Sequence, residues 1–316
     1  MTSAVIVDIV RTASGRGKPG GALSGVHPAE LLATTLRSLL ERTGVDPATV
    51  DDVIAGCVGQ VGDQGVNIAR TALLTAGFPE SVPGTSVDRQ CGSSQQAAHF
   101  AAQGVIAGAY DIVIACGVES MSRVPMGMSA AGGNPTATLA ERYPEGLVNQ
   151  GVSAELIAAR WKLNRAELDE YSARSHQRAA QAITDGAFER EIVPVPVTGP
   201  DGVTDHLIDQ TVRSTTTAEG LAGLRPSFED PAIAARFPEL TDWVITPGNS
   251  SPLTDGASAA LIMSEEKAKE LGLTPRARFH SFSVTGSDPL LMLTGVIPAT
   301  QKILAKSGLS IEDLDV

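Results

Sequence analysis

Aromatic residues, cysteines and basic residues are all scarce in this chain of 316 residues. Aromatic residues make up 4% of the sequence, and there are three cysteines, Cys57, Cys91 and Cys116. So few cysteines, odd in number and without a Cys-x-x-Cys pair, argue against a secreted disulfide scaffold and a structural zinc site. The 24 Lys and Arg are outnumbered by 36 Asp and Glu, for a net charge of −12. This balance argues against a surface for nucleic acids or anionic membranes.

The sequence predicts neither a leader segment nor a membrane span. It reads directly into an apolar strand at residues 4–10, without a basic segment before it. The uncharged run at residues 91–110 contains Gln95, Gln96 and His99, which favours a buried helix over a membrane span. Because this run is rich in Ala and Gly, we expect the helix to be buried on all sides. We therefore expect a cytoplasmic, soluble protein.

Strands and helices alternate over the first part of the chain. Hydrophobic residues make up 42% of the sequence, enough for a sizeable core. The apolar runs are nearly continuous, as expected for a sheet covered on both faces. The pattern predicts strands at 5–10, 53–58, 85–88 and 112–116, and helices at 28–42, 68–76 and 91–110.

Residues 123–240 differ in character from the segments on either side. Gly, Pro and Met interrupt the first part, polar helices are predicted at 154–161 and 165–185, and irregular stretches follow. A strand at 257–263 and a helix at 265–271 then resume the earlier pattern. We interpret residues 123–240 as a domain or an elaborate loop region inserted into an α/β unit.

An internal repeat relates the two ends of the chain. Residues 39–51 match residues 303–315: each segment ends a helix at Gly, passes through a polar turn and continues with an apolar residue and Asp. The preceding strands, at 5–10 and 278–284, correspond loosely. The repeat predicts a duplicated fold. The second copy begins near Arg276 and is far shorter than the first, so we expect a sheet edge and an apolar face to be uncovered.

Cys91 is the candidate nucleophile. It follows a predicted strand and opens a predicted helix, where free N–H groups and the helix dipole favour the thiolate. The alternative is a buried, inert cysteine. Cys57 and Cys116 lie inside apolar strands and are predicted to be core residues. None of the histidines is a convincing general base; these are His27, His99, His176, His206 and His280.

The residues around Cys91 resemble the nucleophile motif of the thiolases, a family that includes acetyl-CoA acetyltransferases and 3-ketoacyl-CoA thiolases. The motif reads Val-Asp-Arg-Gln-Cys-Gly-Ser-Ser-Gln-Gln-Ala at residues 87–97. Further similarity to the family lies at Arg11-Thr12, 117–122, 150–155, 246–257 and 295–300. These ordered motifs extend over the whole chain.

The resemblance implies a duplicated five-layer α/β fold with an inserted loop domain and an incomplete second half. The implied core is 1–122 with 241–272, the loop domain is 123–240, and the second half starts at 273–316. The implied activity is acyl transfer between a cysteine thioester and CoA, by thiolytic cleavage of a 3-ketoacyl-CoA or the reverse Claisen condensation. Coenzyme A is then a substrate, with no further cofactor and no metal. A homodimer or a dimer of dimers, paired through the strand at 85–88, is implied as well.

The resemblance also assigns roles to individual residues. Cys91 becomes the acyl carrier, and its N–H contributes to the oxyanion hole. Ser251 matches a position that contacts the pantetheine part of CoA, and Arg213 matches one near its nucleotide end, with a solvated charge as the alternative for Arg213. Glu119 is expected to be structural and to tie the loop domain to the core.

The family's other catalytic groups are an Asn in Asn-Glu-Ala-Phe, a His in Gly-His-Pro and a second Cys. The resemblance places all three beyond Val316, so this chain alone would lack part of the active site. Departures from the family pattern at Ser94, Gln95 and Gln150 suggest bulky acyl groups, including steroid-derived ones.

Two alternatives stay open: a catalytically incomplete acyl-CoA-binding or structural fragment, and a ketoacyl synthase. The α/β pattern disfavours a papain-like hydrolase.

Overall fold

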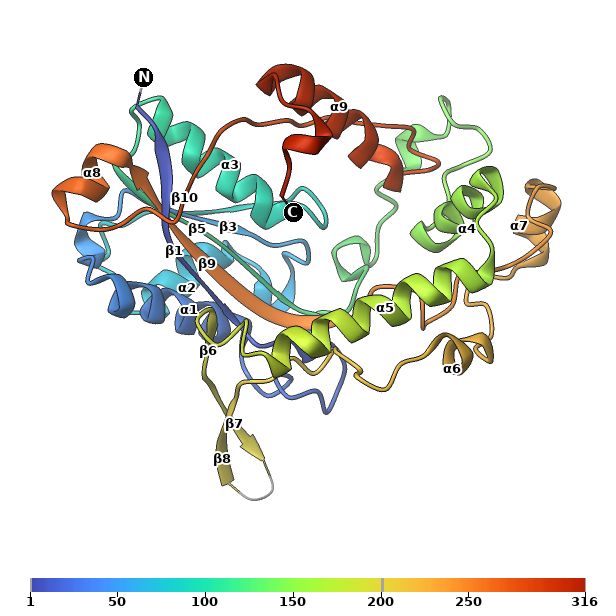
Figure 1. The fold of residues 1–316 in the computed structure, drawn as a ribbon, viewed down its shortest axis with the longest axis horizontal. Coiled ribbons are helices and arrows are strands. Elements are labelled where there is room, and N and C mark those ends of the chain that lie inside the picture. The colour runs from blue at the N-terminus through green and yellow to red at the C-terminus, as the bar shows by residue number, and fades with distance from the viewer. Residues whose placement is uncertain (1, 200–201, 316) are drawn as a thin grey trace. The chain divides into compact units, whose positions relative to one another are not determined.

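The computed structural model describes residues 2–199 and 202–315 (Figure 1), which form two compact units. Unit 1 comprises the described residues of Met1–Gly132, Ile183–Thr211 and Leu253–Phe279. Unit 2 comprises those of Gly133–Ala182, Val212–Pro252 and His280–Val316. Each unit is therefore assembled from three separate stretches of the sequence.

A mixed β-sheet forms the centre of unit 1. Its strands run in the order β10 (Ala277–Arg278), β1 (Ala4–Thr12), β9 (Thr254–Ser264), β5 (Ile112–Ser120), β3 (Asp52–Gly56) and β4 (Gly84–Val87). The short strands β2 (Gly15–Arg16) and β6 (Ile192–Val193) pair with β9 and β1. Neighbours β5, β3 and β4 are parallel, whereas β9 is antiparallel to β1 and β5. Strand β4 ends the order and so lies at an edge.

Helices cover both faces of this sheet (Figure 1). Helices α1 (Pro28–Thr43) and α2 (Ile68–Thr75) lie on one face, and α3 (Ser93–Ile106) lies on the other. Helix α1 starts at Pro28, since His27 caps it, and places its leucines, among them Leu36 and Leu39, in the main core. Burying each such leucine fully stabilises the fold by roughly 1.5–3 kcal/mol. The predicted α/β fold with a covered sheet is confirmed.

Helix α3 differs from the expectation in two ways. It begins at Ser93, two residues after Cys91, and it is not buried on all sides. Ala102 and Val105 pack towards the sheet, whereas Phe100 is 42% and Ile106 is 38% exposed. The expectation of full burial was wrong because α3 lies on one face of the sheet and its opposite side is partly exposed (Figure 1).

The remaining elements of unit 1 are small. Helix α8 (Glu265–Glu270) follows β9 directly and is capped by Ser264. Strands β7 (Val195–Gly199) and β8 (Gly202–His206) pair with each other as an antiparallel two-stranded sheet (Figure 1).

The regular elements described in unit 2 are helices, joined by long irregular stretches and packed around small apolar clusters. Its helices are α4 (Gln150–Trp161), most of α5 (Arg165–Thr184), α6 (Ala218–Ala222), α7 (Pro231–Arg236) and α9 (Val296–Ser307). One cluster joins Leu156 of α4 to Phe237 and Leu240. A Cβ atom at Gly151 would lie 2.2 Å from the ring of Phe228, so this close approach of ring and helix requires a glycine. The polar helices predicted for this region are confirmed.

The two segments of the internal sequence repeat have the same local structure in the helix and in the turn that follows it. Helix α1 ends at Gly44 with a φ of 69°, and a 3-10 helix follows at Pro47–Thr49. Helix α9 ends at Gly308 with a φ of 74°, and a 3-10 helix follows at Ile311–Asp313. The strand predicted at 278–284 was wrong, since only Ala277–Arg278 pairs, with the start of β1. The chain then leaves the sheet, so the following residues have no ladder partner there.

The compact units do not coincide with the domain boundaries implied by the resemblance. Ile183–Thr211 belongs to unit 1 although it falls within 123–240, and His280–Val316 groups with parts of that segment in unit 2. The domain assignment stays a prediction. Across the described residues, no helix combines the length and apolar character that a membrane crossing requires.

Candidate active site

Cys91 lies in a tight turn between the end of β4 and the start of α3. Gln90 adopts a left-handed backbone with a φ of 47°. Its N–H donates to Asp88 Oδ1 at 2.7 Å, and its carbonyl accepts the N–H of Ser93 at 3.0 Å. The N–H of Gly92 donates to the carbonyl of Arg89 at 3.1 Å. The chain therefore reverses within a few residues and leaves the Cys91 residue exposed, directly before the helix.

Two glycines allow the first turn of α3 to sit close to the sheet. Gly56 and Gly117 are neighbours in the register of β3 and β5. A Cβ atom at Gly56 would lie 2.2 Å from the backbone nitrogen of Ser94, and one at Gly117 would lie 2.7 Å from Ser94 Cβ. Larger residues at either strand position would push the helix away. The paired glycines thus fix the height of the Cys91 turn above the sheet.

The other two cysteines are core residues, as predicted. Cys57 and Cys116 are both buried. Burial raises the pKa of the Cys57 thiol to about 12, with help from the nearby negative charges of Glu119 and Asp88. Burial also raises the pKa of Cys116. Because the thiolate is the reactive form, Cys91 is the cysteine best placed for nucleophilic chemistry.

Glu119 has the expected structural role but different partners. Its carboxylate accepts the N–H groups of Val58 at 2.9 Å and Gly59 at 3.1 Å, and the side-chain amide of Gln64 at 2.7 Å. Gln64 in turn accepts the N–H of Ser120 at 2.6 Å. These contacts tie the loop after β3 to the end of β5 within unit 1. The expectation that Glu119 connects residues 123–240 to the core was wrong, because its hydrogen-bond partners lie in the loop after β3. Sequence reasoning missed Gln64, which no motif distinguishes.

Ser251 follows a loop of unit 2 that is held by a partly buried hydrogen-bond network. Asn249 accepts the N–H of Thr246 at 2.8 Å and donates to Asp169 at 3.0 Å and to the carbonyl of Val244 at 2.9 Å. Ser250 donates to the carbonyl of Thr246 at 2.7 Å. The loop is therefore well defined just before the exposed Ser251.

Two buried carboxylates anchor this loop. Glu155 accepts the N–H groups of Val244 at 2.9 Å and Ile245 at 2.8 Å, and Asp169 pairs with Arg165 at 2.7 Å. Burial raises the pKa of Glu155, although its two N–H donors and Arg165 act in the opposite direction. Sequence reasoning gave neither carboxylate a role, although Glu155 closes one of the quoted motifs.

Arg213 is exposed, and its backbone N–H donates to Nδ1 of His176 at 3.2 Å. Burial, and secondarily the positive charge of Arg213, lowers the pKa of His176. Of the predicted site residues, Cys91 belongs to unit 1, while Ser251 and Arg213 belong to unit 2. The roles assigned to these three residues stay predictions.

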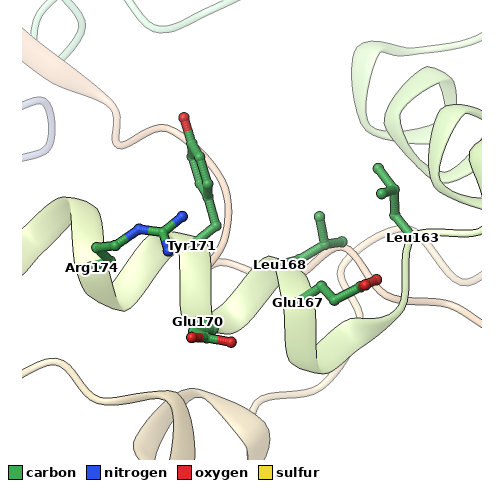
Figure 2. Close-up of a pocket in the computed structure, with 6 residues that line it drawn as sticks. All are labelled: Leu163, Glu167, Leu168, Glu170, Tyr171 and Arg174. Atoms are coloured by element: carbon green, nitrogen blue, oxygen red, sulfur yellow. The ribbon is translucent and has the colours of Figure 1, made fainter.

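A hollow of about 500 Å³ lies along α5 in unit 2 (Figure 2). Its lining includes Leu163, Leu168 and Tyr171, with the guanidinium of Arg174 5.6 Å from the centre of the Tyr171 ring. The lining offers carboxylates but no cysteine, serine or histidine. This hollow is therefore not the candidate active site.

An exposed cysteine on a strand–turn–helix connection of a mixed sheet is a setting in which a thiol can act as a nucleophile, and the chain has the layered sheet and helices of an α/β fold. The family model described as thiolase, N-terminal domain, matches residues 4–266. The chain belongs to the thiolase family.

Comparisons with individual proteins agree with this assignment. The chain is 45% identical to the steroid 3-ketoacyl-CoA thiolase FadA6 of Mycobacterium tuberculosis, over 100% of this chain and 75% of the relative. It is 44% identical to a 3-ketoacyl-CoA thiolase of Pseudoalteromonas translucida, over 100% of this chain and 78% of the relative. The crystal structure of the Bacillus anthracis acetyl-CoA acetyltransferase matches with a TM-score of 0.86 and 39% identity, over 100% of this chain and 79% of that chain. The predicted family and enzyme class are confirmed.

Proposed function

We propose that Cys91 is the nucleophile that carries the acyl group. Its thiolate attacks the 3-keto carbon of a 3-ketoacyl-CoA, and the bond between C2 and C3 breaks. The acyl group stays on sulfur as a thioester, and the carbanion at C2 takes up a proton and leaves as acetyl-CoA. The thiolate of a free CoA then takes the acyl group and regenerates Cys91. The observation that carries this proposal is that Cys91 is exposed before α3 while Cys57 and Cys116 are buried.

The backbone N–H of Cys91 would supply one donor of the oxyanion hole. A tetrahedral intermediate on Cys91 places negative charge on the former carbonyl oxygen, close to the start of α3. A single preorganised donor of this kind contributes about 3–4 kcal/mol to transition-state stabilisation. The positive end of the α3 dipole acts in the same direction.

The CoA substrate would be held by Ser251 and Arg213. Ser251 follows a loop that two buried carboxylates anchor, so its hydroxyl can meet the pantetheine part without much ordering cost. Arg213 is exposed and carries the positive charge that a phosphate at the nucleotide end requires. The proposed reaction needs no metal and no cofactor besides the CoA that serves as substrate.

We further infer a degradative enzyme for bulky acyl groups. Ser94, Gln95 and Gln150 are larger or more polar than the residues usual in the family, and one relative carries steroid 3-ketoacyl-CoA thiolase in its name. A homodimer paired through the edge strand β4 is the proposed assembly. The cytoplasmic location stays a prediction.

Mass spectrometry of the acylated protein tests the proposal. The purified chain is incubated with acetyl-CoA or with a 3-ketoacyl-CoA, digested and mapped, with Cys91→Ser as the matched control. A thioester on the peptide of Cys91, absent from the control, is the expected result. Acylation of Cys57 or Cys116 instead would contradict the assignment. Binding of CoA without any thioester would favour the non-catalytic alternative.

A further inference from the structure

We propose that Ser93 is a positioning residue, whose hydroxyl holds the Cys91 turn in the geometry that acyl transfer requires. This inference rests on the proposed role of Cys91. It concerns a side chain that follows the nucleophile by two residues and has no chemical part in the reaction.

The Ser93 hydroxyl connects the helix to the residues before the cysteine. Ser93 Oγ accepts the N–H of Arg89 at 2.9 Å and donates to the carbonyl of Gln90 at 2.5 Å. The Ser93 residue is only 4% exposed, so water does not readily replace these contacts. Cys91 thus lies inside a loop that the Ser93 hydroxyl closes from the helix side, together with the backbone N–H groups of Gly92 and Ser93.

The Gln90 backbone needs such an anchor. Its φ of 47° is unfavourable for a residue with a side chain, and such a conformation persists only where several contacts impose it. Asp88 accepts the N–H of Gln90, and the Gln90 carbonyl accepts two bonds from Ser93, one from the hydroxyl at 2.5 Å and one from the backbone N–H at 3.0 Å. Loss of the Ser93 hydroxyl would remove the shorter of the two bonds to the Gln90 carbonyl and the acceptor of the Arg89 N–H, and would give the peptide before Cys91 more freedom to rotate.

The helix end that carries Ser93 is itself fixed. Gly56 and Gly117 seat the adjacent Ser94 against β3 and β5, so the start of α3 cannot follow a relaxing turn. A rotation of the peptide before Cys91 would therefore change the orientation of Cys91 Sγ and N–H relative to a stationary helix. Both atoms must face the same acyl carbonyl, one as attacking atom and one as hydrogen-bond donor.

The test follows acetyl transfer from acetyl-CoA to Cys91 in a single turnover, by mass spectrometry of the whole chain. In this step Cys91 sulfur bonds to the acetyl carbon, and the CoA thiolate leaves. The variants are Ser93→Ala, Ser93→Thr, which keeps the hydroxyl, and Thr35→Val. Thr35 is a matched control, because its buried hydroxyl donates to the carbonyl of Leu32 on α1, on the opposite face of the sheet.

We expect Ser93→Ala to lower the maximal acetylation rate about 100-fold, the loss typical of a misplaced reacting group. The half-saturating acetyl-CoA concentration should stay within about twofold, because Ser93 does not contact CoA in this proposal. Ser93→Thr should recover most of the rate, and Thr35→Val should react like the unchanged chain. Iodoacetamide should still alkylate Cys91 in Ser93→Ala, and its melting temperature should match that of Thr35→Val.

An unchanged acetylation rate in Ser93→Ala, or an equal loss in Thr35→Val, would overturn the inference while leaving the proposed function intact. A failure of the unchanged chain to acetylate Cys91, although iodoacetamide reaches it, would overturn the proposed function and the inference with it. Measuring whether the unchanged chain acetylates Cys91 is enough to distinguish these two outcomes.

Discussion

The two copies of the internal repeat have the same local structure and opposite burial. Helix α1 and helix α9 both end at a left-handed glycine whose N–H donates to a carbonyl four residues back, from Gly44 to Leu40 and from Gly308 to Leu304. A short 3-10 helix follows each. Yet α1 buries a row of leucines in the main core, whereas no residue of α9 is buried.

This contrast separates what local sequence decides from what packing decides. Helix termination depends on the glycine and on backbone hydrogen bonds within one turn, so a glycine at the corresponding position produces the same ending in both helices. Burial depends on the elements that lie against the helix, and those differ between the two copies. Substitutions and chemical labelling at buried positions should therefore have different effects from those at exposed positions. Substitutions at the two helix ends should have similar effects on stability.

The largest difference is expected in the alkylation rates of the three cysteines, because burial controls the reactivity of a thiol. At pH 7 a thiol such as Cys57, with its pKa at about 12, is ionised in about one molecule in 10⁵. Cys91 is exposed, so iodoacetamide should label it more than 100-fold faster than Cys57 or Cys116. The labelling of Cys57 should rise with pH, because its deprotonated fraction grows up to about pH 12. Peptide mapping over time provides the rates, and comparable labelling of Cys116 would show that the core of unit 1 opens readily.

The second prediction compares matched positions in the two helices. Leu39 of α1 corresponds to Ile303 of α9; Leu39 is fully buried, and Ile303 is only half-buried. Leu39→Ala should lower the free energy of unfolding by roughly 2–5 kcal/mol, because it removes apolar contacts and leaves a cavity. Ile303→Ala should cost less than half as much. Urea unfolding followed by circular dichroism measures both, and equal losses would mean that α9 is packed as firmly as α1.

Helix α3 allows the same contrast within one element. Ala102 is fully buried against the sheet, whereas Ala107, at the end of the helix, is exposed. Ala102→Leu should destabilise the fold by roughly 1–3 kcal/mol through overpacking. Ala107→Leu should change stability by less than about 0.5 kcal/mol. Thermal unfolding of the two variants decides the matter, and a large loss in Ala107→Leu would indicate that the open face of α3 is covered in solution.

The sequence predicted the features that depend on nearby residues and missed those that depend on distant partners. Apolar runs and caps placed β1, α1, α2 and β5 close to their observed positions, and the motif around Cys91 pointed to the family. The strand at 278–284 failed because a strand needs a neighbour, and only Ala277–Arg278 has one.

The residues of the candidate site also fall into two groups, those that the sequence could identify and those that depend on distant partners. Cys91 could be singled out from its strand–turn–helix setting. The partners of Glu119 and the anchoring role of Asp169 could not, because hydrogen bonds across 50 or more residues leave no local pattern; Gln64 to Glu119 spans 55 residues and Asn249 to Asp169 spans 80. Ser93 was visible in the motif, but its bridging role depends on the left-handed Gln90.

The smallest effect, and the one for which the two copies should agree, concerns the terminating glycines. Gly44 and Gly308 have φ values of 69° and 74°, and a Cβ atom at either position would meet no atom within 4 Å. Replacement by alanine therefore creates no clash, and its cost is the conformational one of a left-handed backbone, about 1 kcal/mol. Gly44→Ala and Gly308→Ala should lower the free energy of unfolding by similar amounts, each for the cooperative transition that contains its helix. Urea unfolding combined with hydrogen exchange at α1 and α9 measures both. A loss of stability for Gly44→Ala alone would mean that α9 and its turn are not formed in solution. The two segments would then share sequence similarity without sharing a structure.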